Sequence, residues 1–378
     1  MKTNTSSHAF VLALLVASFP SSSSLGQGSL TPPGTPAPTM KTLDQIEPRT
    51  ALSATNTPGD AQNLYVITQP GSYYLTAETI CPSGKNAIRI TTSNVTIHLN
   101  GYRLVGSTGS LSGIVLPVAA QRNITIRNGI VADFDQHGID LNVSVTRNVR
   151  ISDVTVLDCG VDGIRVADAA VVTGCIVATN GGDGISGLQG CVVSHCTARG
   201  NIGDGFSLSS AATISDCAAA VNVGNGFSVS FAGNITGCSA YGNSLAGFTL
   251  SNGSAIAYCS ARANGTDGIA VTISCLVKDN TASGNGQAAA GGAGIHATSI
   301  DCRLEGNVCT GQDRGIDVDG AGNFIARNTC SGNTTNWDIV ASNAVAPIIQ
   351  ATTNAAAITG NTYAGSIGST DPNANFTY

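Results

Sequence analysis

The chain has 378 residues, of which 11% are charged, and its formal net charge is −6. So few charged residues, together with 46 glycines, argue against long amphipathic helices. Lys and Arg are scattered through an acidic chain and form no basic stripe, so nucleic acid is excluded as an expected partner.

The N-terminus has the features of an export signal. Lys2 precedes an apolar run over residues 9–19, and a small-residue cleavage site follows at residues 24–26. We therefore expect residues 1–26 to be a signal peptide and the mature protein to be secreted, periplasmic or at the cell surface. No later segment reaches the roughly 20 apolar residues of a transmembrane helix.

A linker and a cap are expected next. Residues 27–63 are rich in Pro, Gly and Thr, a composition that cannot build a core, and residues 40–46 could form a short capping helix. From Leu64 the pattern changes to β, because residues 65–67 and 73–75 are β-branched and aromatic on either side of a Pro-Gly turn.

The chain then repeats itself. A Gly followed by Ile or Phe recurs every 21 residues, and the same pair recurs outside this block with some steps of 25 or 26. These glycines are Gly113, Gly138, Gly163, Gly184, Gly205, Gly226, Gly247, Gly268, Gly294 and Gly315. After each of them apolar and polar residues alternate, as in a strand with one buried face. We predict an all-β, right-handed parallel β-helix over residues 64–345 with coils of about 21 residues, followed by a C-terminal cap or tail over residues 346–378.

Two further columns keep the same phase. They are Cys175, Cys196, Cys217, Cys238 and Cys259, and Asn180, Asn201, Asn222, Asn243, Asn264 and Asn285. Stacked cysteines have parallel Cβ vectors that suit a disulfide poorly, so we expect buried thiols that pack as small apolar groups. Disulfides elsewhere, such as Cys309 with Cys330, and a metal site are the alternatives. Stacked Asn amides can bond to one another, so the second column predicts a buried ladder.

Four aspartates precede the Gly of their coils: Asp162, Asp183, Asp204 and Asp267. Carboxylates stacked about 5 Å apart repel each other by roughly 1–3 kcal/mol, so they must turn toward water or share a cation. We interpret them as turn residues. No cofactor is required, and a bound Ca²⁺ is the alternative.

One outward face carries the candidate chemistry. The residue after each Ile or Phe, and the one two further on, are expected to face solvent, and in the middle of the chain they are mostly Ser and Thr. Ionisable residues collect at both ends, where the first group is Asp133, Asp135, His137, Asp140 and Arg165 and the second is His296, Arg314, Asp317 and Asp319. Carboxylates and His can exchange protons with a sugar, and Arg can hold its carboxylate. A surface ion pair is the alternative for each group.

The chain from Leu64 onward resembles the pectin lyase-like right-handed β-helix proteins, with recurrent stretches at residues 94–97, 123–126 and 148–151. This superfamily includes polysaccharide lyases, polygalacturonases and alginate C5-epimerases. The stretch from His137 to Asn142, His-Gly-Ile-Asp-Leu-Asn, is similar to the epimerase motif Tyr-Gly-Phe-Asp-Pro-His. Only the Gly and Asp140 match, because His137 replaces the Tyr and Asn142 replaces the His.

Three functions are open at this point. The first is an exported β-helix that presents its hydroxyl face to a polysaccharide or a cell-surface glycan. The resemblance implies a second, a lyase or C5-epimerase of a uronate polymer, in which Asp140 and His137 exchange the C5 proton and Arg165 neutralises the carboxylate. The third is a purely structural surface rod.

Overall fold

The structure is a computed structural model that describes residues 49–143, 145–286, 291–351, 353, 357–361 and 365–378. The expected signal peptide, the short helix at residues 40–46 and the linker before residue 49 lie outside these residues. The regular structure of the described part is entirely β. It contains no helix of the length and apolar character that would cross a membrane.

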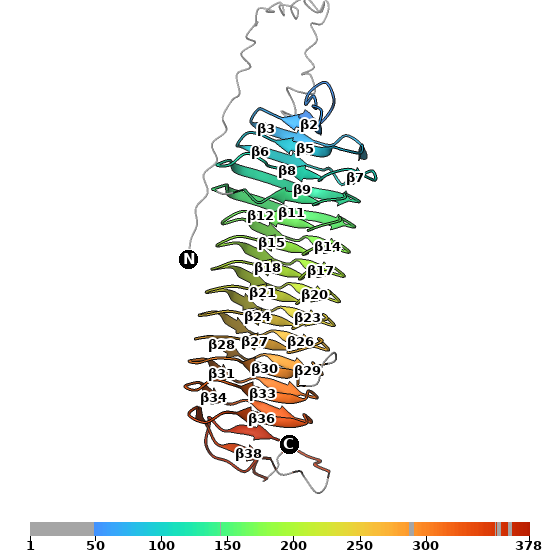
Figure 1. The fold of residues 1–378 in the computed structure, drawn as a ribbon. Helices are drawn as coiled ribbons and strands as arrows, with labels where there is room; N and C mark the ends of the chain where they lie inside the picture. The colour runs from blue at the N-terminus through green and yellow to red at the C-terminus, as the bar shows by residue number, and fades with distance from the viewer. Residues whose placement is uncertain (1–48, 144, 287–290, 352, 354–356, 362–364) are drawn as a thin grey trace, which may run out of the picture. The chain divides into compact units, whose positions relative to one another are not determined.

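The strands form stacked coils, and neighbouring coils pair in parallel (Figure 1). A thirteen-stranded sheet takes one strand from each coil. Its strands are β2 (Asn63–Ile67), β5 (Asn86–Ile90), β8 (Ile114–Val115), β10 (Ile139–Leu141), β12 (Ile164–Val166), β15 (Ile185–Gly187), β18 (Phe206–Leu208), β21 (Phe227–Val229), β24 (Phe248–Leu250), β27 (Ile269–Val271), β30 (Ala293–Ala297), β33 (Arg314–Val318) and β36 (Thr335–Ile339).

A twenty-six-stranded sheet contains two parallel ladders, which the long strands β9 (Arg122–Ala132) and β11 (Arg147–Leu157) join. The first ladder also contains β1 (Arg49–Ala51), β3 (Gly71–Tyr74), β6 (Val95–His98), β13 (Val171–Thr173), β16 (Val192–Ser194), β19 (Thr213–Ser215), β22 (Asn234–Thr236), β25 (Ala255–Ala257), β28 (Leu276–Lys278), β31 (Arg303–Glu305), β34 (Phe324–Ala326) and β37 (Ala344–Val345). The second contains β4 (Thr79–Cys81), β7 (Arg103–Gly106), β14 (Ile176–Ala178), β17 (Thr197–Arg199), β20 (Ala218–Ala220), β23 (Ser239–Tyr241), β26 (Ser260–Arg262), β29 (Thr281–Ser283), β32 (Val308–Thr310), β35 (Thr329–Ser331), β38 (Ile348–Gln350) and β39 (Asn375–Thr377).

Paired strands extend beyond residues 64–345 at both ends. At the N-terminal end β1 pairs with β3, although residues 49–51 were expected to belong to the linker and cap. At the C-terminal end β39 pairs with β35 and with β38. Backbone pairing therefore continues into both segments that flank the predicted repeat.

The core forms because the same residue type returns to the same inward position on each coil. In strands such as Phe206–Leu208 the two outer residues are buried and the middle one is partly exposed. The rings of Phe206, Phe227 and Phe248 stack with centroids 4.7 and 4.8 Å apart and nearly parallel planes. This spacing is the distance between paired strands, so each ring contacts the next without strain.

The Asn column is a buried ladder, as predicted. From Asn180 to Asn264, the backbone N–H and the side-chain amide of each Asn both donate to Oδ1 of the Asn one coil on, at 2.9–3.1 Å. All six residues are at most 3% exposed. The ladder satisfies polar groups that would otherwise be buried without partners.

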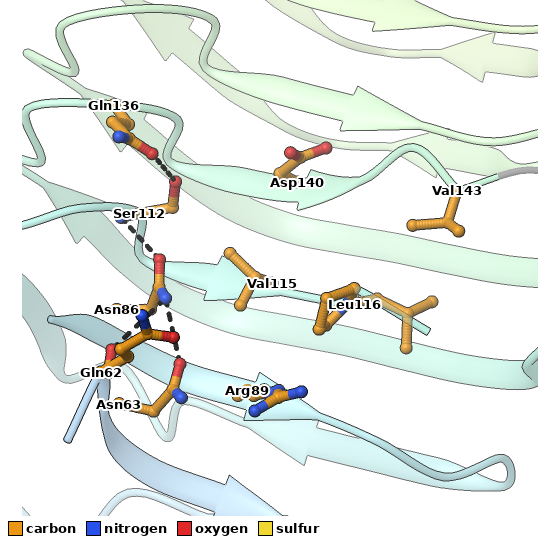
Figure 2. Close-up of a pocket in the computed structure, with 11 residues that line it drawn as sticks. Gln62, Asn63, Asn86, Arg89, Ser112, Val115, Leu116, Gln136, Asp140 and Val143 are labelled. Carbon is orange, nitrogen blue, oxygen red and sulfur yellow. Dashed lines mark hydrogen bonds between the residues drawn. The ribbon is translucent and has the colours of Figure 1, made fainter. Parts of the chain in front are cut away.

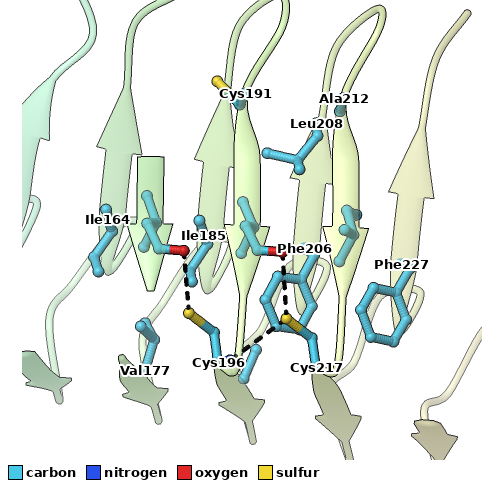
Figure 3. Packing of buried hydrophobic residues seen from close by; sticks show 14 of the residues in the cluster. Ile164, Val177, Ile185, Cys191, Cys196, Phe206, Leu208, Ala212, Cys217 and Phe227 are labelled. Atoms are coloured by element: carbon cyan, nitrogen blue, oxygen red, sulfur yellow. Dashed lines mark hydrogen bonds between the residues drawn. The ribbon is translucent and has the colours of Figure 1, made fainter. Parts of the chain in front are cut away.

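The Cys column is also buried, as predicted, and it does more than fill space. All twelve cysteines of the chain are buried free thiols, so Cys309 and Cys330 lie opposite each other without a disulfide. The backbone N–H groups of Cys175, Cys196 and Cys238 donate to the Sγ atom one coil on, at 3.4 Å. Figure 3 shows the contact of Cys196 with Cys217, and the contacts of both thiols with backbone carbonyl oxygens, near the stacked Phe206 and Phe227.

Thiol and amide side chains substitute for each other in this column. The backbone N–H of Cys259 donates to Oδ1 of Asn280, and the same pattern continues through Asn307 and Asn328 to Asn375. The requirement at this turn is therefore a small side chain whose acceptor atom reaches the backbone N–H of the preceding coil. Sequence analysis missed this continuation because it followed Cys and Asn as separate columns.

Candidate functional site

A third ladder leads into the candidate site, and we call it the turn column. It consists of the residues just before the Gly position of successive coils: Asn86, Ser112, His137, Asp162, Asp183, Asp204 and Asn225. Each side chain accepts the backbone N–H of the residue one coil on, at 2.6–3.3 Å, and the last accepts from Ala246. These N–H donors oppose the repulsion within the Asp series, although burial and the neighbouring Asp162 and Asp204 still raise the pKa of Asp183.

His137, Asp140 and Arg165 come together, as the first predicted group requires. Arg165 of β12 is the register partner of Asp140 of β10, and Arg165 Nη1 lies 3.5 Å from Asp140 Oδ2. The same Nη1 lies 3.3 Å from His137 Nε2. Asp162 holds the guanidinium from the other side, with Oδ2 3.3 Å from Nε. Arg165 is thus oriented by Asp162 and aimed between His137 and Asp140.

His137 is a neutral imidazole in this setting. Burial, with the positive charge of Arg165, lowers the pKa of His137 from its ordinary value against the raising effect of Asp140 and Asp162. A neutral imidazole accepts at one nitrogen only, and we assign that role to Nδ1, which lies 3.3 Å from the backbone nitrogen of Asp162, so the ring proton is on Nε2. The His137 Nε2–H and the Arg165 guanidinium, which already pairs with Asp140 and Asp162, are then two donors that lie side by side.

A groove of about 290 Å³ opens on one side of Asp140 (Figure 2). Arg89, Val115 and Asp140 occupy the same outward position on three successive coils, and all three line this groove. Arg89 lies 3.6 Å from Asp60, while its buried Nε has no hydrogen-bond partner among the described residues. Amide side chains complete the wall, namely Gln62, Asn63, Asn86 and Gln136.

A second groove, of about 350 Å³, begins at Arg165 and continues over the following coils. Its polar lining is mostly hydroxyl: Ser186, Ser207, Ser209, Ser228 and Ser230, with Asp162, Asp183 and Asn142. Arg165 is the only cation among its lining residues. Asp140 and Arg165 therefore lie where two grooves meet on the outer face of the thirteen-stranded sheet.

The second predicted group also comes together, but its hydrogen bonds are mutually satisfied. His296 Nδ1 lies 3.1 Å from Asp267 Oδ2, and Nε2 lies 3.0 Å from Asp319 Oδ2. Arg314 donates to Asp317, whose side chain is only 3% exposed although it was expected to face solvent. Hydrogen bonding to Asp267 raises the pKa of His296 to about 9, against burial and with help from Asp319. His296 is therefore an imidazolium with a carboxylate bonded to each of its ring nitrogens.

This network should make stability depend on pH. The folded-state pKa of His296 is raised, so the stabilisation is complete below an unfolded value near 6.5 and is lost as pH rises through about 9. We expect it to contribute up to about 3 kcal/mol. In His296→Gln the melting temperature should be lower than in wild type at about pH 6 and converge with it at about pH 10. A constant difference across this range would contradict the assignment.

His296, Asp317 and Asp319 also form the one group of His, Cys, Asp and Glu in the described residues whose ligand atoms, within 4.8 Å of one another, could hold a metal ion. No cysteine belongs to it. Arg314 already occupies Asp317 with a charge-assisted hydrogen bond, so a cation would have to compete with a guanidinium there.

Several residues lie elsewhere than the sequence suggested. Asp133 pairs with Arg103 and Asp135 accepts the Gly109 N–H, so neither contacts Arg165. Ala167, expected to face solvent, is fully buried. Conversely, Asp162 and Asp267 were interpreted only as turn residues, yet each contacts the histidine of a cluster. The signal for both was their place just before the Gly of a coil: Asp162 lies one coil after His137, and Asp267 lies one coil before His296.

Comparisons with known proteins agree with this architecture. Residues 123–257 match a family model described as "Right handed beta helix region". No curated protein sequence matches the chain. Among solved structures, the A-module of mannuronan C-5 epimerase AlgE4 from Azotobacter vinelandii is similar at 18% identity and a TM-score of 0.51, over 79% of this chain and 88% of that one. The AlgE6 A-module from the same organism is similar at 17% identity and 0.51, over 79% and 86%. At these identities the likeness concerns the fold, and the chain is a right-handed parallel β-helix protein.

Proposed function

We propose that the protein removes the C5 proton of a uronate residue in an acidic polysaccharide, as a lyase or a C5-epimerase, at the junction of the two grooves. The observation that carries this proposal is the convergence of two N–H donors, from His137 and from an Arg165 guanidinium that Asp162 orients, beside the carboxylate of Asp140. Two donors are what a sugar carboxylate needs, and a nearby base is what its C5 proton needs.

In this proposal the substrate carboxylate accepts from His137 Nε2–H and from the Arg165 guanidinium. Removal of the C5 proton spreads negative charge onto that carboxylate, and the two donors stabilise it more strongly as the charge grows. Asp140 is the base, because its carboxylate is held beside Arg165 and accepts the backbone N–H of Asn142.

This assignment differs from the exchange of the proton between Asp140 and His137 that the motif alone suggested. The turn column occupies Nδ1 of His137 with a backbone N–H, so this ring presents a donor to the substrate instead of a lone pair. After proton removal the intermediate has two fates. Delivery of a proton from water to the opposite face of C5, while Asp140 keeps the first proton and later loses it to water, gives the epimer. Cleavage of the C4–O bond, with the leaving oxygen taking up a proton from water, gives an unsaturated sugar.

The charges along the grooves favour a particular polymer. Arg89 can bind a sugar carboxylate in the first groove, and Arg165 can bind another at the start of the second groove. The serine-lined groove presents Asp162 and Asp183 and would repel a uronate at every position. We therefore propose a polysaccharide in which uronate residues alternate with neutral sugars. The reaction class agrees with the names of the two similar epimerase modules.

The test is an activity screen of the purified protein on gellan, in which uronates are separated by neutral sugars, and on polygalacturonate, in which every residue is a uronate. Absorbance of unsaturated ends reports a lyase, and incorporation of deuterium from solvent at C5, followed by NMR, reports an epimerase. We expect one of these signals on the mixed polymer. Binding without either signal would support a glycan-binding role, and the absence of both binding and turnover would contradict the proposal.

A further inference from the structure

Four arginines lie on two neighbouring coils of the twenty-six-stranded sheet, and two of them are direct neighbours. Arg122 and Arg127 belong to β9, and Arg147 and Arg150 belong to β11 on the next coil. All four are exposed. Within the described residues none of them has an ion pair or a side-chain hydrogen bond. They are conspicuous in a chain whose net charge is −6.

Arg122 and Arg147 are direct neighbours in the strand register. Like charges at the spacing of paired strands repel each other, and no carboxylate of the described residues pairs with either of them. Together they line a pocket of about 240 Å³, whose other walls are Ala120, Gln121 and Val145. The pocket therefore combines two guanidinium groups, one amide and a small apolar surface.

That composition suits a sugar carrying an oxyanion. Guanidinium groups bind carboxylate and sulfate through paired hydrogen bonds, and Gln121 can bond to a hydroxyl. The side chains of Ala120 and Val145 offer an apolar surface for the C–H groups of a pyranose ring.

The pocket is also next to the first groove. Pro117 and Val143 line that groove, while Ala120 and Val145 line the arginine pocket, so the same two turns lie between them. A polysaccharide strand that leaves the first groove across these turns would meet Arg122 and Arg147.

We propose that Arg122 and Arg147 form a second binding site, for a carboxylate- or sulfate-bearing sugar of a polysaccharide strand. The site anchors the polymer and takes no part in the chemistry at Asp140. It rests on the proposed function only for the class of polymer, because binding here needs no turnover.

The experiment measures binding of polygalacturonate and of dextran sulfate by calorimetry at low and moderate salt. The double variant Arg122→Ala/Arg147→Ala should bind at least one polymer about tenfold more weakly. Lysine at both positions keeps the charge but loses the paired hydrogen bonds, and should fall between the double alanine variant and wild type. Arg199→Ala is the matched control, because Arg199 is exposed on the same sheet between Ala178 and Ala220 and should change binding by less than about twofold.

The polymer that responds identifies the oxyanion. Equal binding by wild type and the double alanine variant would overturn the inference, and so would adsorption to anionic vesicles in place of both polymers. Asp140→Asn separates this inference from the proposed function. Arginine-dependent binding without any turnover would leave this site standing and remove the proposed chemistry, whereas turnover with binding insensitive to Arg122 and Arg147 would do the reverse.

Discussion

Asp140→Asn is expected to lower kcat on a uronate-containing polysaccharide by about 10²–10⁴-fold, because it removes the base while keeping the shape of the side chain. Binding should change little, since Arg165 and His137 remain to hold the sugar carboxylate. The measurement is the initial rate of unsaturated product, or of deuterium incorporation at C5, together with the affinity of the polymer. A variant that keeps most of its turnover would rule out Asp140 as the base.

Two substitutions of His137 distinguish a donor from a base. Gln retains an N–H group near the position of Nε2, so His137→Gln should keep more activity than His137→Ala if the residue donates to the carboxylate. If His137 were the base, neither Gln nor Ala could replace it, and both variants should be equally inactive. His296→Gln, which changes the closed cluster on later coils, is the control and should leave the rate unchanged.

The pH profile gives an independent check on the same assignment. If His137 were the base, the rate would follow the titration of its imidazole, and Asp140→Asn would keep that profile but move it to lower pH, because the charge of Asp140 raises the pKa of His137. With Asp140 as the base, Asp140→Asn should instead leave no turnover that follows the imidazole.

Much of the fold could be predicted because each coil of a solenoid repeats the same residue pattern in the sequence. The Gly, Cys and Asn columns each recur every 21 residues, and a residue that returns at that interval must return to the same place on the coil. The ends were harder to predict. Strand β39 pairs with β35 at the position that the next coil would take. Asn375 therefore continues the ladder of Asn328, although the two residues are 47 positions apart in the sequence.

The candidate site could be predicted only in part. The repeat predicted that Asp140 lies beside Arg165, since each directly follows the recurring Ile of its coil. They did not reveal the state of His137, because that depends on a backbone N–H one coil away. Asp162 looked like a repeated turn residue, and it is one. Its Oδ1 serves the turn column while its Oδ2 holds Arg165, and a one-letter pattern cannot separate the two roles.

Asn222→Leu should cause a large loss of stability in the middle coils. Asn222 is fully buried and bonds through its side chain to Asn201, Asn243 and the Ala198 carbonyl. Leucine has similar volume but leaves the partners of these bonds unpaired in the core. Each orphaned group costs about 1–3 kcal/mol, so we expect a total loss of roughly 3–5 kcal/mol, measured as a lower denaturation midpoint in urea.

Asn234→Leu is the matched control, because it makes the same chemical change at an exposed residue of β22. It should shift stability by no more than about 0.5 kcal/mol. The comparison also tests how the ladder transmits damage. Each coil packs only on its neighbours, so the loss at Asn222 should first appear as faster amide exchange in the coils of Asn201 and Asn243, and last in the end coils. Uniform exchange throughout the chain would mean that the coils unfold as one cooperative unit and that the ladder is not a chain of local contacts.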